Sequence, residues 1–520
     1  MSQTGKRQLI QVHQSTVNRI AKDGLRPREW IFNTRTRLRT GIFQEYVLDY
    51  KILDVCLVFK QTLEPGRVAE AVAILCAWYP MLAGRVEFSH DVAVAGAKKW
   101  VTHNDKGCSL VLATMEGMGY ADLHDHDRTI DHLNFCDIET DMPNKILSGV
   151  APVMTVQLTK LQRGGCVLGI ALSHCVCDHG GLQQLLQDWS KLYQDPLALI
   201  MPTANVPDCY FNAPSGGEIQ AHMRTLGLMR LERNLSNQLI KDAKVGLSLI
   251  GQRLASHCRE RPDHVRLSFT KFQKDLLINT AANDEEIDHS VTTNEAVLVY
   301  IWNLMLDTIE FPMEQREHLA VMMYVDPRSR VSEADVGSRT FGSIIAGISV
   351  PVNMRGSLGT VTSSVHFSSR KALRTEKIAA SVKMEATIFP ENESGEVLFN
   401  PQTTTENSGC IGEWFYGAPL LDWQRGTKMA TFGADLVRCE VGYSGEGVKV
   451  SPRVDGGLDV YLTRMDRLYF NGWPETLAKY PYKGAFVDEL KKRHDSWCRK
   501  IKPPRRSAFN FAMGLMDAQQ

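Results

Sequence analysis

The chain has 520 residues, of which 43% are hydrophobic and 23% are charged, and its 59 Lys and Arg side chains balance 59 Asp and Glu side chains. This composition is typical of a globular protein with enough apolar material for a large core, and the length predicts about two to four domains. Because no long basic run occurs, the sequence lacks the electrostatic footprint of a nucleic-acid-binding protein, and we expect no nucleic-acid partner.

The first predicted elements alternate between strands and helices. Residues 51–60 alternate in hydrophobicity, which is typical of a strand with one buried face. Pro-Gly at 65–66 breaks the chain, and apolar residues at helical spacing then predict a helix that ends at Tyr79. A strand is predicted at 81–88. Two strands joined by an Arg-Gly-Gly turn, followed by a helix, account for 153–193.

An irregular stretch separates these elements from a second α/β set. Residues 195–217 carry four prolines and a Ser-Gly-Gly run. We therefore predict an N-terminal domain at 1–205, a crossover linker at 206–225 and a C-terminal domain at 226–520. The second set is predicted to contain helices near 294–308 and 359–382 and strands near 318–326, 343–352 and 458–462.

The compartment is inferred from the cysteines and from the N-terminus. Twelve cysteines are scattered along the chain, most of them inside apolar segments. The N-terminus has no apolar signal region, and the longest apolar run, near 296–306, is far short of a membrane span. We therefore expect free thiols in a cytoplasmic protein that does not associate with a membrane.

The most informative segment lies between the predicted strand pair and the helix after it. His174 stands at the end of the second strand, and Asp178 follows four residues later. A histidine at a strand end suits a general base. Gly180 and Gly181 then open the helix, where small residues allow close approach of backbone or ligand. The His-x-x-x-Asp spacing is weak by itself, because chance gives roughly one such match in a chain of this composition, and a purely structural histidine is the competing interpretation.

Two other chemistries compete for this segment. Several side chains of metal-ligand type crowd it: His174, Cys175, Cys177, Asp178 and His179. Zinc sites usually combine Cys-x-x-Cys or similar pairs from separated segments, and no second Cys-x-x-Cys or His-x-x-x-His pair occurs, so we predict no metal. A nucleophilic Cys175 or Cys177, activated by a neighbouring histidine, stays open.

Several segments, in order, resemble the BAHD acyl-CoA-dependent acyltransferases, with the fungal trichothecene-acetyltransferase type nearest. The strand pair with His174 and Asp178 matches the His-x-x-x-Asp region of that family. The further matching segments are Tyr79-Pro-Met-Leu-Ala-Gly-Arg85, Asp326-Pro-Arg-Ser-Arg330, Phe341-Gly342, Trp423, Phe432-Gly433 and Asp455-Gly-Gly-Leu458. The resemblance runs over most of the chain.

The sequence departs from the family pattern at several positions. His179 intervenes between the signature Asp and the glycine that follows it in the family. Thr431 and Ala434 replace the Asp and the Trp of the family's Asp-Phe-Gly-Trp-Gly motif, which bears on local packing. Leu421 stands where many plant members have a hydroxyl near the substrate carbonyl, so another donor has to stabilise the oxyanion.

The resemblance implies an α/β fold of two chloramphenicol-acetyltransferase-like domains, each a mixed β-sheet flanked by helices, with an active-site channel between them. It also implies acyl-CoA, with acetyl-CoA expected, as co-substrate and no bound cofactor. In the implied reaction His174 takes the proton of a secondary-metabolite hydroxyl, and the oxygen attacks the thioester in a ternary complex without an acyl-enzyme. A monomer that binds acyl-CoA and a small alcohol is expected.

The resemblance further implies roles for the residues around His174. Asp178 would orient the loop through an ion pair, with Arg328 as its first partner, Arg330 as the second, and Asp326 as further support. The implied substrate-binding residues are Trp423, Phe432, Gly433, Gly180 and Gly181. Basic residues at helical spacing are candidates for contact with CoA, although a solvated helix face explains them equally well: Lys371, Arg374 and Lys377.

Two other functions stay open. A stand-alone condensation-like enzyme shares the fold and the His-x-x-x-Asp core but takes acyl groups from carrier proteins. That family usually has a second histidine before the signature, where this chain has Ser173. A repurposed member would bind or cyclise a metabolite in the same channel without acyl transfer, and Leu421, Thr431 and Ala434 keep this alternative open.

Overall fold

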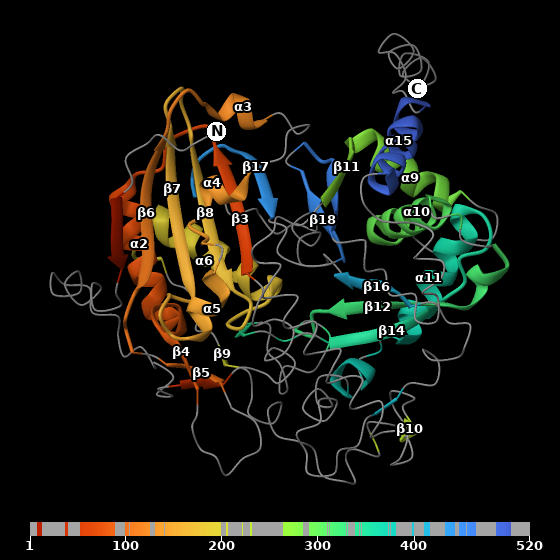
Figure 1. Cartoon of the computed structure of the whole chain (residues 1–520), viewed down its shortest axis with the longest axis horizontal. Coiled ribbons are helices and arrows are strands. Elements are labelled where there is room, and N and C mark those ends of the chain that lie inside the picture. The colour runs from red at the N-terminus through yellow and green to blue at the C-terminus, as the bar shows by residue number, and fades with distance from the viewer. Residues whose placement is uncertain are drawn as a thin grey trace, which may run out of the picture.

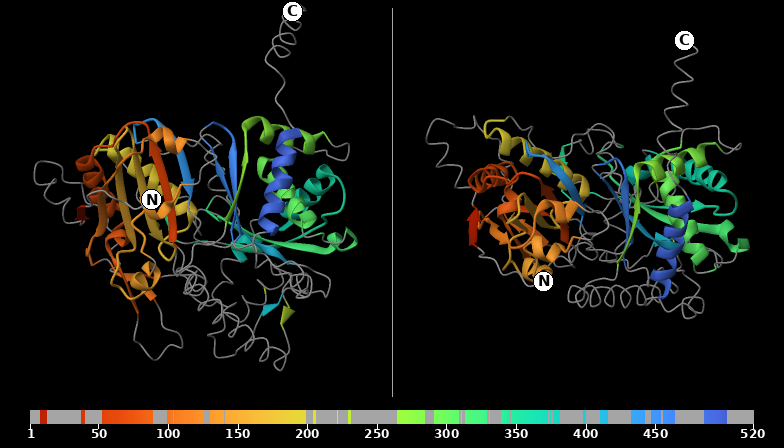
Figure 2. Two further views of the ribbon diagram at one scale, coloured as in Figure 1. Left: turned by 45° about the horizontal axis from the view of Figure 1, so that its top comes forward. Right: turned by 90° about the horizontal axis from the view of Figure 1, so that it is seen from above.

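The structure of the chain is a computed structural model with two hydrophobic cores. It describes residues 8–12, 37–39, 52–88, 99–102, 104–124, 130–139, 141–198, 204–205, 221, 229–230, 264–283, 291–308, 310, 313–328, 330, 339–342, 344, 346–372, 374, 376–380, 398–399, 410–415, 432–441, 447–453, 455–463 and 485–500. The first core, which includes Leu57 and Trp189, surrounds a six-stranded sheet. The second core, which includes Trp302 and Leu462, is built from two three-stranded sheets and four helices. Figures 1 and 2 show the two side by side.

The six-stranded sheet is mixed, with the strand order β1-β6-β7-β8-β3-β17. Its strands are β1 (Gln8–Val12), β3 (Ile52–Phe59), β6 (Cys108–Met115), β7 (Met154–Leu161), β8 (Cys166–Ser173) and β17 (Leu436–Val441). Only the β6–β7 pair is parallel. All side chains of β3 and β8 are buried, as is typical of strands covered on both faces.

Helices cover both faces of this sheet. Figure 1 shows α4 (His132–Phe135) in front of it, while α2 (Pro65–Trp78) and α6 (His179–Gln194) lie together on the opposite face. Leucines and Trp189 on one side of α6 are buried, as is typical of a helix with one apolar face. The shorter elements nearby are η2 (Pro80–Ala83), α3 (Tyr120–His124), α5 (Met142–Leu147) and the sheet of β2 (Arg37–Arg39), β4 (Arg85–Phe88) and β5 (Lys99–Thr102).

The second core follows the same scheme with smaller sheets. Its strands are β11 (His264–Phe269), β12 (Leu319–Val325), β14 (Ala346–Val352), β16 (Cys410–Phe415), β18 (Gly447–Pro452) and β19 (Leu458–Thr463). Its helices are α9 (Lys271–Ala282), α10 (Thr293–Thr308), α11 (Leu358–Ala372) and α15 (Ala485–Lys500). The remaining elements are β9 (Ala204–Asn205), β10 (Met229–Arg230), η4 (Met313–His318), β13 (Thr340–Phe341) and β15 (Leu398–Phe399).

The C-terminal half also contributes to the first core. Strand β17 pairs antiparallel with β3 and forms the edge of the six-stranded sheet that faces the second core (Figures 1 and 2). Strand β13 pairs in parallel with β9, and Phe341 packs edge-to-face on Tyr79. The chain therefore crosses between the cores more than once. Of the predicted linker 206–225 the structure describes only Ala221, and the boundaries stay a prediction.

Most predicted elements agree with the structure, and two differ from it. The strand expected at 81–88 begins only at Arg85, because the residues after Tyr79 form the 3-10 helix η2. The helix expected at 359–382 is interrupted: α11 ends at Ala372, Arg374 is not helical, and residues 376–380 are helical again. Within the described part of the chain, no helix has both the length and the apolar character needed to cross a membrane.

Candidate active site

His174 lies directly after the last residue of β8, in the turn that leads into α6. The turn before β8 contains Gly164 and Gly165, both with positive φ, which gives the hairpin its tight reversal. The side chain of His174 is only 1% exposed, and its ring meets that of His179 edge-to-face, with the centroids 5.9 Å apart. The sequence thus predicted the placement of His174 at the strand end correctly.

The carboxylate of Asp178 connects α6 to the second half of the chain. Its Oδ1 accepts the backbone N–H of Gly181 at 2.8 Å and so caps the helix. Its Oδ2 accepts hydrogen bonds from Arg328 Nη1 at 2.9 Å and from the backbone N–H of Ile344 at 2.7 Å. The backbone N–H of Asp178 donates to the carbonyl of Gly342 at 3.3 Å. These four bonds, which we call the Asp178 clamp, use both carboxylate oxygens for structure.

Arg328 is buried at the centre of the clamp. Besides Asp178, its guanidinium donates to Asp326 Oδ1 at 3.0 Å and to the carbonyls of Thr340 at 2.7 Å and Gly342 at 2.8 Å. Burial alone would lower the pKa of Arg328, but the charges of Asp178 and Asp326 raise it above its ordinary value. Arg328 is therefore a permanent cation, and Asp178–Arg328 is the ion pair predicted from the sequence.

The two glycines after the signature allow other side chains of the protein to pack closely beside them. A Cβ on Gly180 would collide with the Asp326 carboxylate and lie 2.9 Å from Arg328 Nη1. A Cβ on Gly181 would lie 2.9 Å from the Cβ of Cys177. The chain itself thus occupies the space beside Gly180 and Gly181, which explains why both residues are small, and their contact with substrate stays a prediction.

The substrate-binding role expected for Phe432 requires a correction. Phe432 is fully buried in the first core, where it packs edge-to-face on Phe59, Trp189 and Tyr193. Its backbone N–H donates to Ser190 Oγ, and Gly433 lies beside Gln194, at the far end of α6. At 1.5 Å per residue, Ser190 and Gln194 are roughly 16 and 22 Å along the helix from His179. Phe432 therefore supports the core, far along α6 from His174, and contact of Gly433 with substrate stays a prediction.

Other candidate residues have no described contacts near His174. Trp423, Leu421 and Thr431 lie outside the described residues. Lys371 and Arg374 are exposed and Lys377 is half-buried, so their contact with CoA stays a prediction. The side chain of Arg330, the second-choice partner of Asp178, is exposed.

A second contact between the halves explains the Tyr-Pro-Met-Leu-Ala-Gly-Arg segment. The hydroxyl of Tyr79 donates to Asp188 Oδ2 at 2.6 Å, and Arg339 Nη2 donates to the same oxygen at 2.7 Å. Neither Asp188 nor Arg339 was predicted from the sequence, because their pairing depends on where residues 339–342 lie in the fold. This contact attaches the middle of α6 to the second half, just as the Asp178 clamp attaches its N-terminus.

The structure bears on both alternative chemistries of the signature segment, a nucleophilic cysteine and a metal site. Burial and the charge of Asp178 raise the pKa of Cys177 well above its ordinary value, so this thiol is a poor nucleophile. Among the described residues, the side chains close enough to share a metal ion lie elsewhere, at Cys56, His132 and Cys136. The sequence search missed this group, although the His-x-x-x-Cys spacing of its last two members was visible.

Comparison with known proteins shows that part of the chain is similar to an enzyme family. Residues 45–217, which include His174 and Asp178, match the model of the Transferase family. Anthranilate N-benzoyltransferase proteins 1 and 2 of Dianthus caryophyllus are each 24% identical over 351 residues, which cover 65% of this chain and 70% of theirs. These findings support an acyltransferase of the BAHD type.

Solved structures confirm the predicted fold. TRI101 of F. sporotrichioides, crystallised with coenzyme A and T-2, superposes with a TM-score of 0.55 at 13% identity, covering 82% of this chain and 94% of that one. Vinorine synthase superposes with a TM-score of 0.53 at 14% identity, covering 88% and 94%. At these identities the likeness shows the fold alone, and the channel between the halves stays a prediction.

Proposed function

We propose that the protein transfers an acyl group, expected to be acetyl, from acyl-CoA to a hydroxyl of a small secondary metabolite, with His174 as general base. The observation that carries the proposal is the position of His174. It lies at a strand end of the family-matching core, four residues before an aspartate that is held by the second half of the chain. The fungal trichothecene-acetyltransferase type remains our proposed branch of the family.

The bonds and protons of the proposed reaction balance without any further cofactor. His174 accepts the proton of the acceptor hydroxyl, and the oxygen attacks the carbonyl carbon of the thioester. The tetrahedral intermediate then expels the CoA thiolate, and the imidazolium of His174 returns the proton to the sulfur. Histidine suits both steps because its ordinary pKa of about 6.5 permits either protonation state near neutrality.

Asp178 acts in this proposal as a positioning residue. Both of its carboxylate oxygens are occupied, by Gly181 on one side and by Arg328 and Ile344 on the other. In this proposal Asp178 therefore does not exchange a proton with substrate. Its contribution is to fix the turn of residues 174–178 between β8 and α6, because a base must be held within hydrogen-bond reach of the proton that it removes.

The donor is proposed to be a CoA thioester. The solved relatives TRI101 of F. sporotrichioides and of F. graminearum are described in complex with coenzyme A or ethyl coenzyme A. The curated relatives are named as N-benzoyltransferases. Amine acceptors and benzoyl donors therefore belong in the test beside hydroxyl acceptors and acetyl donors.

The test is acceptor-dependent release of free CoA thiol, with product mass as a second readout. Acetyl-CoA and benzoyl-CoA are each offered with a panel of hydroxylated metabolites and a matched panel of amines. Ester formation from acetyl-CoA supports the full proposal, whereas amide or benzoyl products would correct the acceptor or the acyl group. Turnover of carrier-bound thioesters alone would favour the condensation-like enzyme, and binding of acyl-CoA without turnover would favour the repurposed member.

A further inference from the structure

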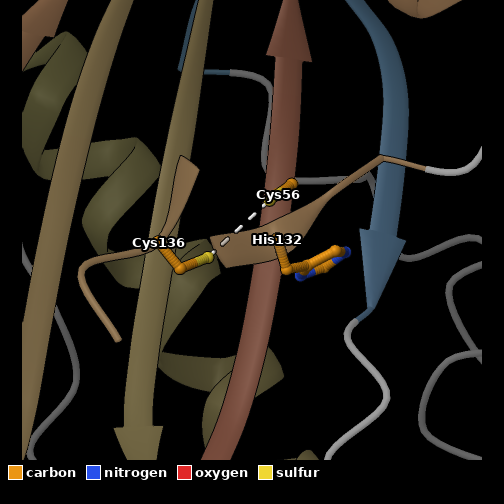
Figure 3. Close-up of side chains that lie close together, drawn as sticks. All are labelled: Cys56, His132 and Cys136. Atoms are coloured by element: carbon orange, nitrogen blue, oxygen red, sulfur yellow. Dashed lines mark hydrogen bonds between the residues drawn. The ribbon is translucent and has the colours of Figure 1, made fainter. Parts of the chain in front are cut away.

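A second cluster of chemically reactive side chains lies inside the first core. Cys56 belongs to β3, while His132 and Cys136 stand at the two ends of the short helix α4 that covers this strand (Figure 3). Their ligand atoms, two sulfurs and an imidazole nitrogen, all lie within 4.8 Å of one another. The side chains are 0%, 6% and 1% exposed, respectively. The reaction proposed above uses none of them.

Local structure explains why the three residues meet. Asp131 caps α4 by accepting the backbone N–H of Leu133, and the backbone N–H of Cys136 donates to the carbonyl of His132 at 2.7 Å. His132 and Cys136 are thus one helical turn apart, and side chains at this spacing lie on the same face. That face lies against β3, where Cys56 points up from the sheet toward them (Figure 3).

The distance between the sulfurs fits a shared metal ion. Cys56 Sγ and Cys136 Sγ are 3.7 Å apart. Two thiolates at the usual Zn–S distance of about 2.3 Å, arranged tetrahedrally, would be about 3.8 Å apart. The separation of the sulfurs therefore matches a shared zinc ion, and the imidazole, whose ligand nitrogen lies within 4.8 Å of both sulfurs, would complete three protein ligands by moving toward the ion.

The surroundings of the cluster are rich in acidic groups. Asp54 Oδ2 lies 2.8 Å from His132 Nδ1, and Glu440 Oε1 lies 3.9 Å from His132 Nε2. Arg438 forms an ion pair with Glu440. A carboxylate that bonds the ring of a histidine is the usual outer partner of a zinc-bound imidazole, because it fixes the ring and raises its basicity. The buried carboxylates also compensate for the charge of a cation.

We propose that Cys56, His132 and Cys136 bind a zinc ion that fastens α4 to β3. Binding breaks the S–H bonds of the two thiols and releases their protons, together with any imidazolium proton, to solvent. The ion would stabilise the covered face of the six-stranded sheet next to the edge strand β17. This site is independent of acyl transfer, so it stands whether or not the proposed reaction is correct.

The chain contains a matched control pair. Cys76 on α2 and Cys108 on β6 are also fully buried, and their sulfurs are likewise 3.7 Å apart. They are not part of a metal-binding group among the described residues. A thiol pair without a histidine is therefore available in the same core.

The test is the zinc content of the full chain, purified without chelators and dialysed against zinc-free buffer, measured by elemental mass spectrometry. We expect about one zinc ion per wild-type chain, its loss in Cys56→Ser and Cys136→Ser, and its retention in Cys76→Ser and Cys108→Ser. Wild-type protein that neither contains zinc nor takes it up from added zinc chloride would overturn the proposal. Equal zinc content in all four variants would do the same.

A second measurement covers the case in which the variants fail to fold. Cobalt(II) added to wild-type protein stripped of zinc should produce thiolate-to-cobalt charge-transfer absorption and raise the melting temperature. Absence of that absorption would contradict thiolate ligation. Counting of free thiols after denaturation, together with mapping of the linked peptides, separates the remaining alternative, because a Cys56–Cys136 disulfide in metal-free protein as purified would overturn the metal site.

Discussion

Arg328 donates a 2.9 Å hydrogen bond to Asp178 and so joins the second half of the chain to the N-terminus of α6. The two residues are 150 positions apart in the sequence, and both are buried. The signature aspartate, one turn away from His174, thus contacts the second half of the chain. Disturbing it should affect stability and turnover together.

Removal of the cation should be strongly destabilising. Arg328→Leu leaves the carboxylates of Asp178 and Asp326 buried with reduced compensation, and breaking a buried pair from one side typically costs about 3–5 kcal/mol. Urea denaturation measures the loss. The matched control is Arg330→Leu, whose side chain is exposed and whose effect should stay within about 0.5 kcal/mol. Equal effects of the two substitutions would refute the clamp.

The coupling between the two clamp residues can be measured directly. Asp178→Asn keeps an oxygen for the cap on Gly181 but presents an amide to Arg328 and to the N–H of Ile344. In a double-mutant cycle with Arg328→Leu, the two losses of unfolding free energy should fall short of additivity by about 0.5–3 kcal/mol. Additive losses would mean that the residues do not act as a pair. Asp178→Asn should also reduce turnover, because His174 would be less well positioned.

Gly180 should tolerate no side chain. In Gly180→Ala the new methyl group meets Asp326 and Arg328, and overpacking of this kind typically costs about 1–3 kcal/mol. The control is Gly66→Ala near the start of α2, where the methyl would meet only the flexible side chain of Glu64. Thermal denaturation of both variants measures the loss of stability. A Gly180→Ala variant as stable as wild type would show that the clamp can move aside.

Local patterns in the sequence predicted much of the first core. The alternation in β3, the hairpin of β7 and β8, and the apolar stripe of α6 depend on neighbours within a few residues. The position of His174 was therefore within reach, whereas the Asp178–Arg328 pair, 150 positions apart, was expected only from the resemblance to a family. Strand β17 was not assigned to the first sheet, because its pairing with β3 brings together segments almost 400 residues apart.

The residues whose surroundings were not predicted from the sequence were missed for the same physical reason. Phe432 belongs to a segment that resembles a family motif, but only the fold reveals that Trp189 and Tyr193 enclose it. Cys56 and Cys136 are 80 positions apart and meet because α4 covers β3. Spacing rules applied to short segments do not detect ligands that tertiary packing brings together.

His494 on α15 should make the second core sensitive to acid. Burial lowers the pKa of His494, although its bond with the carbonyl of Ser268 and the charge of Asp495 oppose this effect. A histidine with a depressed folded-state pKa gains its proton first in the unfolded chain, so stability falls as the pH drops below about 6.5. The ring also contacts the Tyr300 hydroxyl at 3.1 Å and Cys498 Sγ at 3.4 Å.

The variant His494→Gln isolates this effect. It should be less stable than wild type at about pH 8, where the neutral histidine packs well, and the difference should shrink toward about pH 5. Melting temperatures of the two proteins across this range give the answer. Parallel curves would mean that His494 does not titrate with the depressed pKa.

The most direct test of the central proposal compares His174→Ala with His179→Ala in the assay of acceptor-dependent thiol release. The two rings touch, but only His174 is proposed to move the proton. A positioned base contributes about 10²–10⁴ in rate, so His174→Ala should lower turnover at least about 100-fold, whereas His179→Ala should stay within about tenfold of wild type. Circular dichroism would verify that both variants are folded. A folded His174→Ala that retains more than about a tenth of wild-type turnover would contradict the assignment of His174 as the base.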